Sequence, residues 1–450
     1  MHTAVRALSR ARACPGRITT VHVTPAWRLL ALVAALATAG ACRGERGRGA
    51  PGAADAGAFV LIEPAPPGAP PATPPATPPA ALPAVPPGAE AILQAAQRSQ
   101  IRADEDVMFF PTAGALVREG DQDVWKLPVH GWIYEPEVND VLRDAFVRSI
   151  MQSLDGSAAE LDSAVLEERL RGFLFDNERD KRIEVEIAGQ VFALPASQAD
   201  GHFEDVLSVP ADVARAAARD GRLTVRAITR PDDHRQLTGE IFLLEPRGLL
   251  VVSDIDDTVK ITEVRDRKAM VRNTFLVPFR AVPGMAELYV RWLDRAAGDH
   301  LHFVSSSPWQ LYTALRAMLD QAAFSPATVT LKRIRLKDRS VTALFADPRE
   351  TKPKAIEALL DAHSARPVIL VGDSGELDPE IYGEVARRHP RRIRYIAIRD
   401  VTNESASAPR YHEAFADVPP ERWQIFREPG ELPDRARLDA LDAHIGAPQP

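Results

Sequence analysis

The sequence is poor in cysteine. Only Cys14 and Cys42 are present among 450 residues, and both lie before residue 50. Two thiols are too few for a disulfide-stabilised scaffold or for a cysteine-rich zinc site. The chain beyond residue 50 contains no thiol, so it can work in an oxidising compartment without forming wrong disulfides.

A large excess of charge of one sign is also lacking. The chain has 55 Lys+Arg and 62 Asp+Glu, a formal net charge of −7 at pH 7. This mild acidity gives no global electrostatic reason to expect a nucleic-acid partner. A hydrophobic content of 45% beside 26% charged residues excludes a fully disordered chain. The length predicts roughly two or three domains with at least one sizeable core.

The apolar stretch near the N-terminus is short. Residues 29–41 are apolar over thirteen positions, whereas a membrane-spanning helix needs about 20. Five arginines and no acidic residue precede the stretch, and small residues end it, which is typical of a secretory signal. We therefore expect residues 1–42 to be a leader that directs export to the cell envelope.

The residues directly before Cys42 resemble a bacterial lipoprotein cleavage site. One departure is Ala39, which stands where such sites usually carry leucine. We expect Cys42 to be lipid-modified and the protein to be anchored facing the periplasm or the cell exterior. Simple secretion is the alternative.

Residues 43–88 are rich in proline and alanine. Twelve of the 24 residues from Pro64 to Pro87 are proline. Such a segment forms neither helix nor ladder, and at about 3.1 Å per residue it would extend on the order of 75 Å. It is interpreted as a tether that holds a folded body away from a membrane, or as a featureless linker.

The first folded region, residues 89–248, is predicted to be a β-rich accessory domain, and a small sandwich is the architecture expected for it. Strand-like segments cover 123–133, 182–187, 222–228 and 239–244, and a helical insertion covers 138–173. No catalytic constellation is evident in it. His130 and His202 are interpreted as isolated structural residues.

The pattern changes after Gly248. Continuous apolar segments at 249–253, 300–304, 367–371 and 393–398 alternate with helical stretches at 284–297, 309–321, 353–363 and 379–389. This alternation predicts an α/β domain with a doubly wound parallel sheet over 249–400. The C-terminal extension, 401–450, is expected to pack on this domain and to fray at its end. Ligands of such sheets bind at the carboxyl ends of the strands.

Three carboxylates follow the first of these strands. Asp254, Asp256 and Asp257 lie within four residues, and their mutual repulsion requires a neutralising partner. Mg²⁺ suits this requirement because it prefers oxygen ligands and bridges to phosphate. A solvated acidic turn is the structural alternative, and the D-x-D-x-T pattern alone is only suggestive.

Polar residues follow the other strands as well. Ser305 ends the second strand, and Ser307 before Pro308 is interpreted as a helix cap. Lys352 opens a helix, where a lysine can balance phosphoryl charge. Asp373 directly follows the most apolar strand, and Asp378 before Pro379 is interpreted as a cap or as a residue that orients the site.

Taken together, these signals resemble the haloacid dehalogenase superfamily of phosphotransferases. The chain is more closely similar to the actin-patch-associated phosphatidate phosphatase family. Four phrases carry this resemblance: Ser253-Asp-Ile-Asp-Asp-Thr-Val-Lys260, Asn273-Thr-Phe-Leu-Val-Pro-Phe-Arg-Ala-Val-Pro-Gly-Met285, Ser305-Ser-Ser-Pro-Trp-Gln-Leu311 and Gly372-Asp-Ser-Gly-Glu-Leu-Asp-Pro-Glu-Ile-Tyr382. They span about 249–400, and Leu377 is a small departure because relatives often carry a polar residue there.

The resemblance implies a role for each matching residue. Asp254 matches the nucleophile, Asp256 the general acid and base, and Ser305 the phosphate-binding hydroxyl. Lys352 matches the motif lysine, with Lys354 as the fallback, and Asp373 matches the late metal ligand. Mg²⁺ would be held by Asp254, Asp373 and the backbone carbonyl of Asp256, and Thr258 and Asp378 would support the site.

The implied function is Mg²⁺-dependent hydrolysis of phosphatidate to diacylglycerol and phosphate at a membrane surface, through an aspartyl-phosphate. Basic residues precede apolar ones in the segment 260–283, which is a candidate for contact with an anionic lipid. The alternative is that its aromatic residues belong to the core and its charges are solvated. One alternative is a phosphatase of another phosphomonoester, soluble or a lysophospholipid. Another is a catalytically idle envelope protein that binds lipid through its β-rich region.

Overall fold

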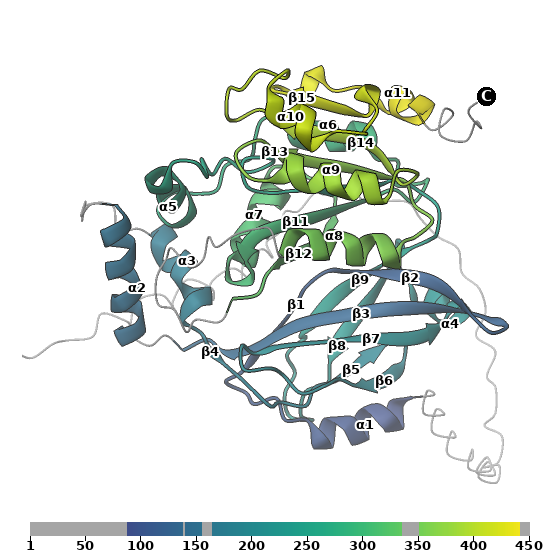
Figure 1. Ribbon diagram of the computed structural model, residues 1–450. Coiled ribbons are helices and arrows are strands. Elements are labelled where there is room, and N and C mark those ends of the chain that lie inside the picture. Colours follow the sequence, from purple (N-terminus) through teal and green to yellow (C-terminus); the bar gives the residue numbers. More distant parts are fainter. Residues whose placement is uncertain (1–87, 138–139, 155–163, 335–350, 442–450) are drawn as a thin grey trace, which may run out of the picture. The chain divides into compact units, whose positions relative to one another are not determined.

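The computed structural model describes residues 88–137, 140–154, 164–334 and 351–441 (Figure 1). The predicted leader and tether and the lipid-modified Cys42 lie outside the described residues, as does the end of the chain after 441. The described residues belong to one compact unit, Ala81–Pro450. None of the described helices combines the length and the apolar character that crossing a membrane requires.

The first sheet is mixed and has nine strands. Its order is β1-β3-β2-β9-β8-β5-β6, with β4 and β7 also paired to β3. The strands are β1 (Asp106–Phe109), β2 (Thr112–Glu119), β3 (Gln122–Glu135), β4 (Asp176–Asn177), β5 (Glu184–Ile187), β6 (Gln190–Ala193), β7 (His202–Pro210), β8 (Arg222–Ala227) and β9 (Thr238–Leu244).

The long strand β3 joins many of these strands into one hydrogen-bonded sheet, and the predicted sandwich stays a prediction. Along its fourteen residues it pairs with β1, β2, β4 and β7. Its alternate side chains, among them Trp125 and Leu127, are buried in a core shared with Val185 of β5 and Leu223 of β8. Helices α1 (Ala89–Arg98) and α4 (Ala211–Ala217) flank the sheet, and α2 (Asp140–Ser153) and α3 (Ala164–Leu174) occur where the helical insertion is predicted.

The second sheet has six parallel strands in the order β12-β11-β10-β13-β14-β15. The strands are β10 (Leu250–Ser253), β11 (His300–Pro308), β12 (Ala327–Lys332), β13 (Val368–Asp373), β14 (Ile393–Arg399) and β15 (Trp423–Phe426). The prediction of an α/β fold with a parallel sheet is confirmed. The four interior strands match the predicted apolar segments, whereas the two edge strands, β12 and β15, were not predicted.

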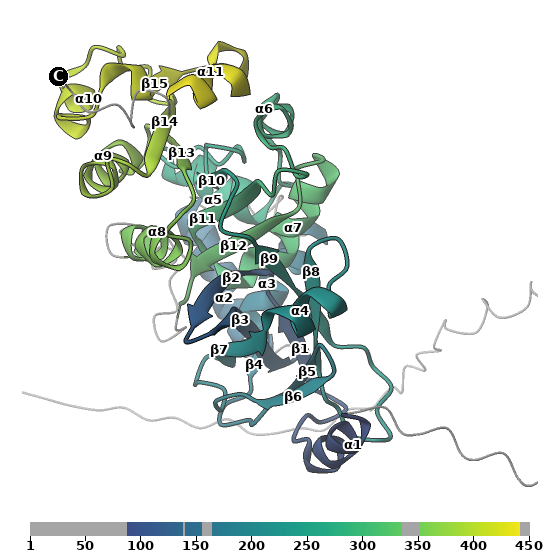
Figure 2. The ribbon, with the colours of Figure 1, turned by 90° about the vertical axis from the view of Figure 1, so that its right-hand side faces the viewer.

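Helices cover both faces of the parallel sheet (Figure 2). One core cluster joins Val251 and Phe303 to α5 (Arg267–Phe275), α6 (Met285–Trp292) and α7 (Tyr312–Gln321). The other cluster joins Val252 and Leu370 to α8 (Thr351–Ala362), α9 (Asp378–Arg388) and α10 (Pro409–Ala414). Adjacent residues of one strand therefore enter opposite cores, which is why these strands are apolar without alternation. The short elements η2 (Trp309–Leu311), η4 (Pro420–Arg422), η5 (Pro429–Glu431) and α11 (Arg435–Ala440) complete the described chain.

Helix α6 is shorter than the stretch 284–297 predicted from the sequence. It ends at Trp292, and Asp299 then accepts hydrogen bonds from the backbone N–H groups of Asp294 (2.8 Å) and Leu249 (2.6 Å). The Asp299 carboxylate closes a turn before β11, and this turn replaces the last part of the predicted helix. The apolar pattern of the sequence does not reveal such a turn.

One of the hydrophobic clusters contains residues of both sheet regions. The ring of Phe110, in the first sheet region, packs at a tilt against that of Trp309, with ring centroids 4.0 Å apart, and both residues belong to the cluster that contains Val251 and Phe303. His130 and His202 lie at this contact and are not isolated as predicted, since their Nε2 and Nδ1 atoms are 3.0 Å apart.

The two histidines are buried against the rings of Phe110, Trp132 and Trp309. Burial lowers the pKa of His130 well below its ordinary value and that of His202 to about 4. Both rings are therefore neutral near pH 7 and are part of the packing between the two sheets.

Candidate active site

Asp254 is the first residue after β10, at the centre of the parallel sheet. Its backbone N–H donates to the carbonyl of Val371 (2.8 Å), which keeps it in register with β13. Its side chain is 1% exposed, and its Oδ2 accepts a hydrogen bond from Thr258 Oγ1 (3.0 Å). Burial raises the pKa of Asp254 well above its usual range, against the lowering effect of Lys352. Thr258 thus lies where a supporting residue is expected.

Asp256 is surrounded by donors. Its Oδ2 accepts from Ser305 Oγ (2.9 Å) and Ser307 Oγ (2.8 Å), and its Oδ1 accepts from Thr262 Oγ1 (2.9 Å) and pairs with Lys260 Nζ (2.7 Å). Burial alone would raise the pKa of Asp256, but Lys260 and the hydroxyl donors outweigh it and lower the pKa to about 2. In this state Asp256 is a carboxylate.

Asp257, the third carboxylate of the motif, has a structural role. It adopts a left-handed backbone conformation, with φ of 55°. Its side chain accepts hydrogen bonds from the backbone N–H groups of Thr262, Glu263 and Val264, at 2.7–2.8 Å. The loop therefore folds back on itself and returns Lys260 to Asp256. This lysine was not singled out from the sequence, because no local pattern reveals the turn.

Ser307 was predicted to be a helix cap, and this prediction is wrong. Ser307 and Pro308 still belong to β11, and η2 begins only at Trp309 with Pro308 at its N-cap. Instead, the backbone N–H of Ser307 donates to Ser305 Oγ (2.9 Å) while both serine hydroxyls donate to Asp256. The extra length of β11 carries this second hydroxyl into the site.

Lys352 enters the site from the first turn of α8. Its Nζ lies 3.0 Å from Asp254 Oδ1, 2.5 Å from Asp378 Oδ1 and 3.2 Å from Glu376 Oε2. Its side chain is 1% exposed; burial lowers the pKa of Lys352, but these three carboxylates raise it well above its ordinary value. Lys354, the fallback, is exposed on α8. The structure therefore places Lys352, and not Lys354, among the site residues.

Asp373 and Asp378 complete the buried acidic group. Asp373 ends β13, and its Oδ1 accepts from the backbone N–H groups of Gly375 (2.6 Å) and Glu376 (3.2 Å). Asp378 does not cap α9, whose N-cap is Leu377; its Oδ2 accepts from the backbone N–H of Asp373 (3.2 Å). Burial, together with Asp378 and Asp254, raises the pKa of Asp373 well above its usual range.

This acidic group has the chemistry of a cation site. Carboxylate oxygens of Asp254, Asp373 and Asp378 all lie within 4.8 Å of one another, and all three residues are buried. Asp373 Oδ2 is buried and accepts no hydrogen bond from the described residues, and Asp254 Oδ1 has only the ion pair with Lys352. Three buried carboxylates this close together beside one lysine fit a hard divalent cation, since an uncompensated buried carboxylate is costly.

The side chain of Asp256 is not part of this acidic group. Its predicted contact with the metal concerns its backbone carbonyl and stays a prediction. A second acidic group, formed by Glu105, Glu135 and Glu178, is already engaged in ion pairs with Arg102 and Lys181.

The segment that holds Asp254, Lys352 and Asp373 is similar to a known protein family. Residues 249–400 match the family described as phosphatidate phosphatase APP1, catalytic domain. This segment is similar to that catalytic domain. We call residues 249–400 the family segment.

Two fungal relatives are similar to the chain. Phosphatidate phosphatase APP1 of Saccharomyces cerevisiae is 31% identical over 198 residues, which cover 43% of this chain and 33% of the relative. An uncharacterized protein of Schizosaccharomyces pombe is 32% identical over 170 residues, covering 37% of this chain and 27% of the relative. The chain thus spans a third or less of the length of these curated relatives.

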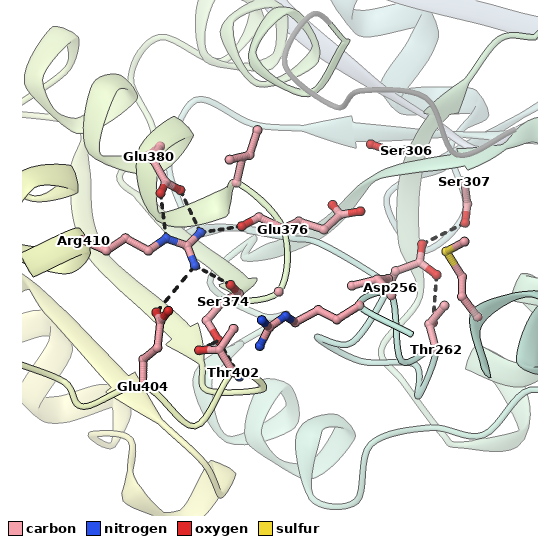
Figure 3. Close-up of a pocket in the computed structure, with 15 residues that line it drawn as sticks. Asp256, Thr262, Ser306, Ser307, Ser374, Glu376, Glu380, Thr402, Glu404 and Arg410 are labelled. Carbon is pink, nitrogen blue, oxygen red and sulfur yellow. Dashed lines mark hydrogen bonds and ion pairs between the residues drawn. The ribbon is translucent and has the colours of Figure 1, made fainter. Parts of the chain in front are cut away.

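A cavity of about 530 Å³ opens beside the acidic residues (Figure 3). Asp256, Ser306 and Ser307 line it on the side of β10 and β11. The rest of its lining is mixed, with the apolar residues Val264, Met270 and Leu377 among polar and charged ones. Its volume is within the range of small-molecule sites. Two arginines also line it, Arg265 from the family segment and Arg410 from beyond its end. Neither arginine was predicted as a site residue.

The basic and apolar segment 260–283 lies partly in the site. Lys260 and Arg169 of α3 both approach the ring of Phe279, at 4.7 Å and 3.9 Å from its centroid. Phe275 and Leu276 are buried in the core. The apolar residues of this segment are therefore core residues, whereas Arg265, Arg267 and Lys268 are exposed.

Proposed function

We propose that this protein is a Mg²⁺-dependent phosphatidate phosphatase that hydrolyses phosphatidate to diacylglycerol and phosphate through an aspartyl-phosphate. The proposal includes a doubly wound, haloacid dehalogenase-like sheet in the family segment. One observation carries it: buried Asp254, Lys352 and Asp373 converge at the carboxyl ends of neighbouring parallel strands within the family segment. The name of the yeast relative supports the lipid substrate.

In the first step Asp254 is the nucleophile. A carboxylate oxygen of Asp254, whose ionised form the adjacent Lys352 favours, forms a bond to phosphorus while the bond from phosphorus to the ester oxygen breaks. Asp256 gives a proton to the departing alkoxide. Since Asp256 is ionised in the free protein, it must first take up a proton, which the negative charge of an incoming phosphoryl group favours.

In the second step Asp256 acts as the base. It removes a proton from the water that attacks phosphorus, and the carboxylate of Asp254 leaves. Ser305 and Lys352 donate to the phosphoryl oxygens, and Thr258 holds Asp254 in place. Asp254 and Asp373 would hold Mg²⁺, which when bound supplies positive charge to the phosphoryl oxygens.

The wider setting of the activity is also part of the proposal. An exported, lipid-anchored protein with an extended tether would meet phospholipid substrates at the surface of a membrane. The leader, Cys42 and the tether lie outside the described residues, so this setting is supported by the sequence alone.

Phosphate release from the purified full-length chain in detergent tests the proposal. Phosphatidate in mixed micelles and a set of soluble phosphomonoesters are each offered with Mg²⁺ or with EDTA. We expect release from phosphatidate that EDTA abolishes and that Asp254→Asn lowers by roughly 10³-fold or more, because the nucleophile is lost. Asp212→Asn, on an exposed position of α4, is the control and is expected to keep full activity.

Other outcomes separate the alternatives. Phosphate release from soluble esters alone would still support a phosphomonoester hydrolase and would reject phosphatidate as the substrate. An Asp254→Asn protein with normal activity would reject Asp254 as the nucleophile. If no substrate is hydrolysed, a lipid-binding protein without catalytic activity becomes the better reading.

A further inference from the structure

Arg410 lies on α10, outside the family segment, and reaches the loop that follows β13 (Figure 3). Its guanidinium donates to the backbone carbonyls of Ser374 (2.6 Å) and Glu376 (2.5 Å). The same guanidinium forms a two-pronged ion pair with Glu380 (2.7 and 3.0 Å), and Glu404 lies 3.8 Å away. One side chain therefore joins α10, α9 and the loop.

The loop that Arg410 holds is the one that orients Asp373. The backbone N–H groups of Gly375 and Glu376 donate to Asp373 Oδ1, whereas the carbonyls of Ser374 and Glu376 accept from Arg410. The peptide units of this loop are thus fixed from both sides, by Asp373 on one and by Arg410 on the other. The position of Asp373 Oδ2, which the described residues leave without a donor, depends on this fixed loop.

The same loop also positions the catalytic lysine. The side chain of Glu376 lies 3.2 Å from Lys352 Nζ, and Lys352 in turn pairs with Asp254. A displacement of the backbone at Glu376 would therefore alter the contacts of both Asp373 and Lys352.

The geometry suits a positioning role better than a surface ion pair. The side chain of Arg410 is 25% exposed, and its planar fork meets two carbonyls and a carboxylate at once. Gly375 is in close contact as well, since a Cβ there would lie 2.9 Å from Asp373 Oδ1. A loop with so little room has few alternative conformations once Arg410 is in place.

We propose that Arg410 is a positioning residue for the metal site, and that the catalytic unit extends beyond the family segment to include α10. Arg410 acts through the loop of residues 374–376 and does not touch the reacting atoms. The proposal rests on the proposed function in so far as Mg²⁺ is the ion that Asp254 and Asp373 hold.

The test compares Arg410→Ala and Arg410→Lys with a matched control, Arg387→Ala. Arg387 of α9 also donates to backbone carbonyls of the α10 region, at Ala414 (2.7 Å) and Ala416 (3.2 Å), but it does not contact the 374–376 loop. Mg²⁺ affinity is measured by calorimetry on the full-length chain without substrate, together with the thermal midpoint, kcat and KM.

We expect Arg410→Ala to weaken Mg²⁺ binding about tenfold or more and to lower kcat more than it changes KM, because loss of charge-assisted hydrogen bonds frees the loop. Arg410→Lys should recover part of the affinity, since a lysine keeps the charge but cannot hold both carbonyls and Glu380 together. Arg387→Ala should lower the thermal midpoint and leave Mg²⁺ affinity unchanged.

Two results would overturn the inference. One is an Arg410→Ala protein with the Mg²⁺ affinity of the wild type, whatever its stability. The other is an equal loss of Mg²⁺ affinity in Arg387→Ala, which would show a general effect of loosening α10. If the wild-type protein binds Mg²⁺ but does not hydrolyse phosphatidate, the proposed function fails, and weakened binding by Arg410→Ala still supports Arg410 as a positioning residue.

Discussion

At the scale of single residues, the site holds more negative than positive charge. Its lysines are engaged already, Lys352 by three carboxylates and Lys260 by Asp256. Arg265 differs, because it lines the cavity and has no hydrogen bond or ion pair with any residue that the structure describes. A guanidinium in this position can bind the phosphoryl group of an incoming substrate.

Arg265→Ala is expected to raise KM for phosphomonoesters about tenfold, with a smaller change in kcat. A charge-assisted hydrogen bond contributes on the order of 1–3 kcal/mol, and about 1.4 kcal/mol corresponds to a factor of ten. Steady-state kinetics on phosphatidate and on a soluble ester measure the change. The control is Arg267→Ala, an exposed arginine two residues away that does not line the cavity. Equal effects of the two variants would show that Arg265 contributes only general surface charge and does not bind the phosphoryl group.

The sequence predicted the site residues that lie at or near the carboxyl ends of strands. Asp254, Ser305 and Asp373 could be placed together because parallel strands end at one edge of the sheet. Residues that enter from folded-back loops or from other elements were missed, and these are Lys260, Glu376 and Arg410. Ser307 was misinterpreted as a cap, and Arg265 was named only within the candidate lipid-contact segment 260–283. Lys260 returns to Asp256 only because Asp257 adopts a left-handed conformation, which no apolar periodicity encodes.

At the scale of elements, interior strands were easier to predict than edge strands. β10 and β13 are buried along their whole length and give continuous apolar segments. β12 and β15 lie at the two edges of the sheet and are only partly buried, so their patterns are mixed. Helix ends set by a side chain, such as the turn that Asp299 closes, were likewise not predictable from periodicity.

The contact between α9 and α10 gives a prediction at this scale. A Cβ on Gly383 of α9 would lie 1.8 Å from the backbone oxygen of Ala414, so Gly383→Ala forces the two helices apart. We expect a loss of about 1–3 kcal/mol in the free energy of unfolding, measured by denaturant titration. Gly430→Ala is the control, since no described atom lies within 4 Å of its Cβ position. A Gly383→Ala protein as stable as the control would contradict the close packing.

At the scale of the whole molecule, neutral histidines are buried in both sheet regions. Burial lowers the pKa of His202 to about 4, of His302 to about 3 and of His363 to about 4. In the unfolded chain these groups titrate near pH 6.5. Between these values the unfolded chain binds protons that the folded protein does not, so each histidine lowers stability as the pH falls from about 6.5 to 4.

The stability of His363→Gln should therefore depend less on pH than that of the wild type. Raised pKa values of Asp254 and Asp373 act in the opposite sense, so the histidine contribution is obtained as a difference between the two proteins. We expect this difference to change by about 1 kcal/mol per pH unit between pH 6.5 and 4, measured by denaturant unfolding. Parallel pH profiles would show that His363 takes up its proton equally well in the folded protein.

The buried lysines of the site have a consequence for chemical labelling. The chain contains only eight lysines, and two of them, Lys260 and Lys352, are each 1% exposed. An amine-reactive reagent should modify exposed Lys354 readily and leave these two intact while the fold persists. Mass spectrometry of the peptides that carry Lys352 and Lys354 would then give the ratio of acylated Lys352 to acylated Lys354. A rise in this ratio would mark opening of the candidate active site.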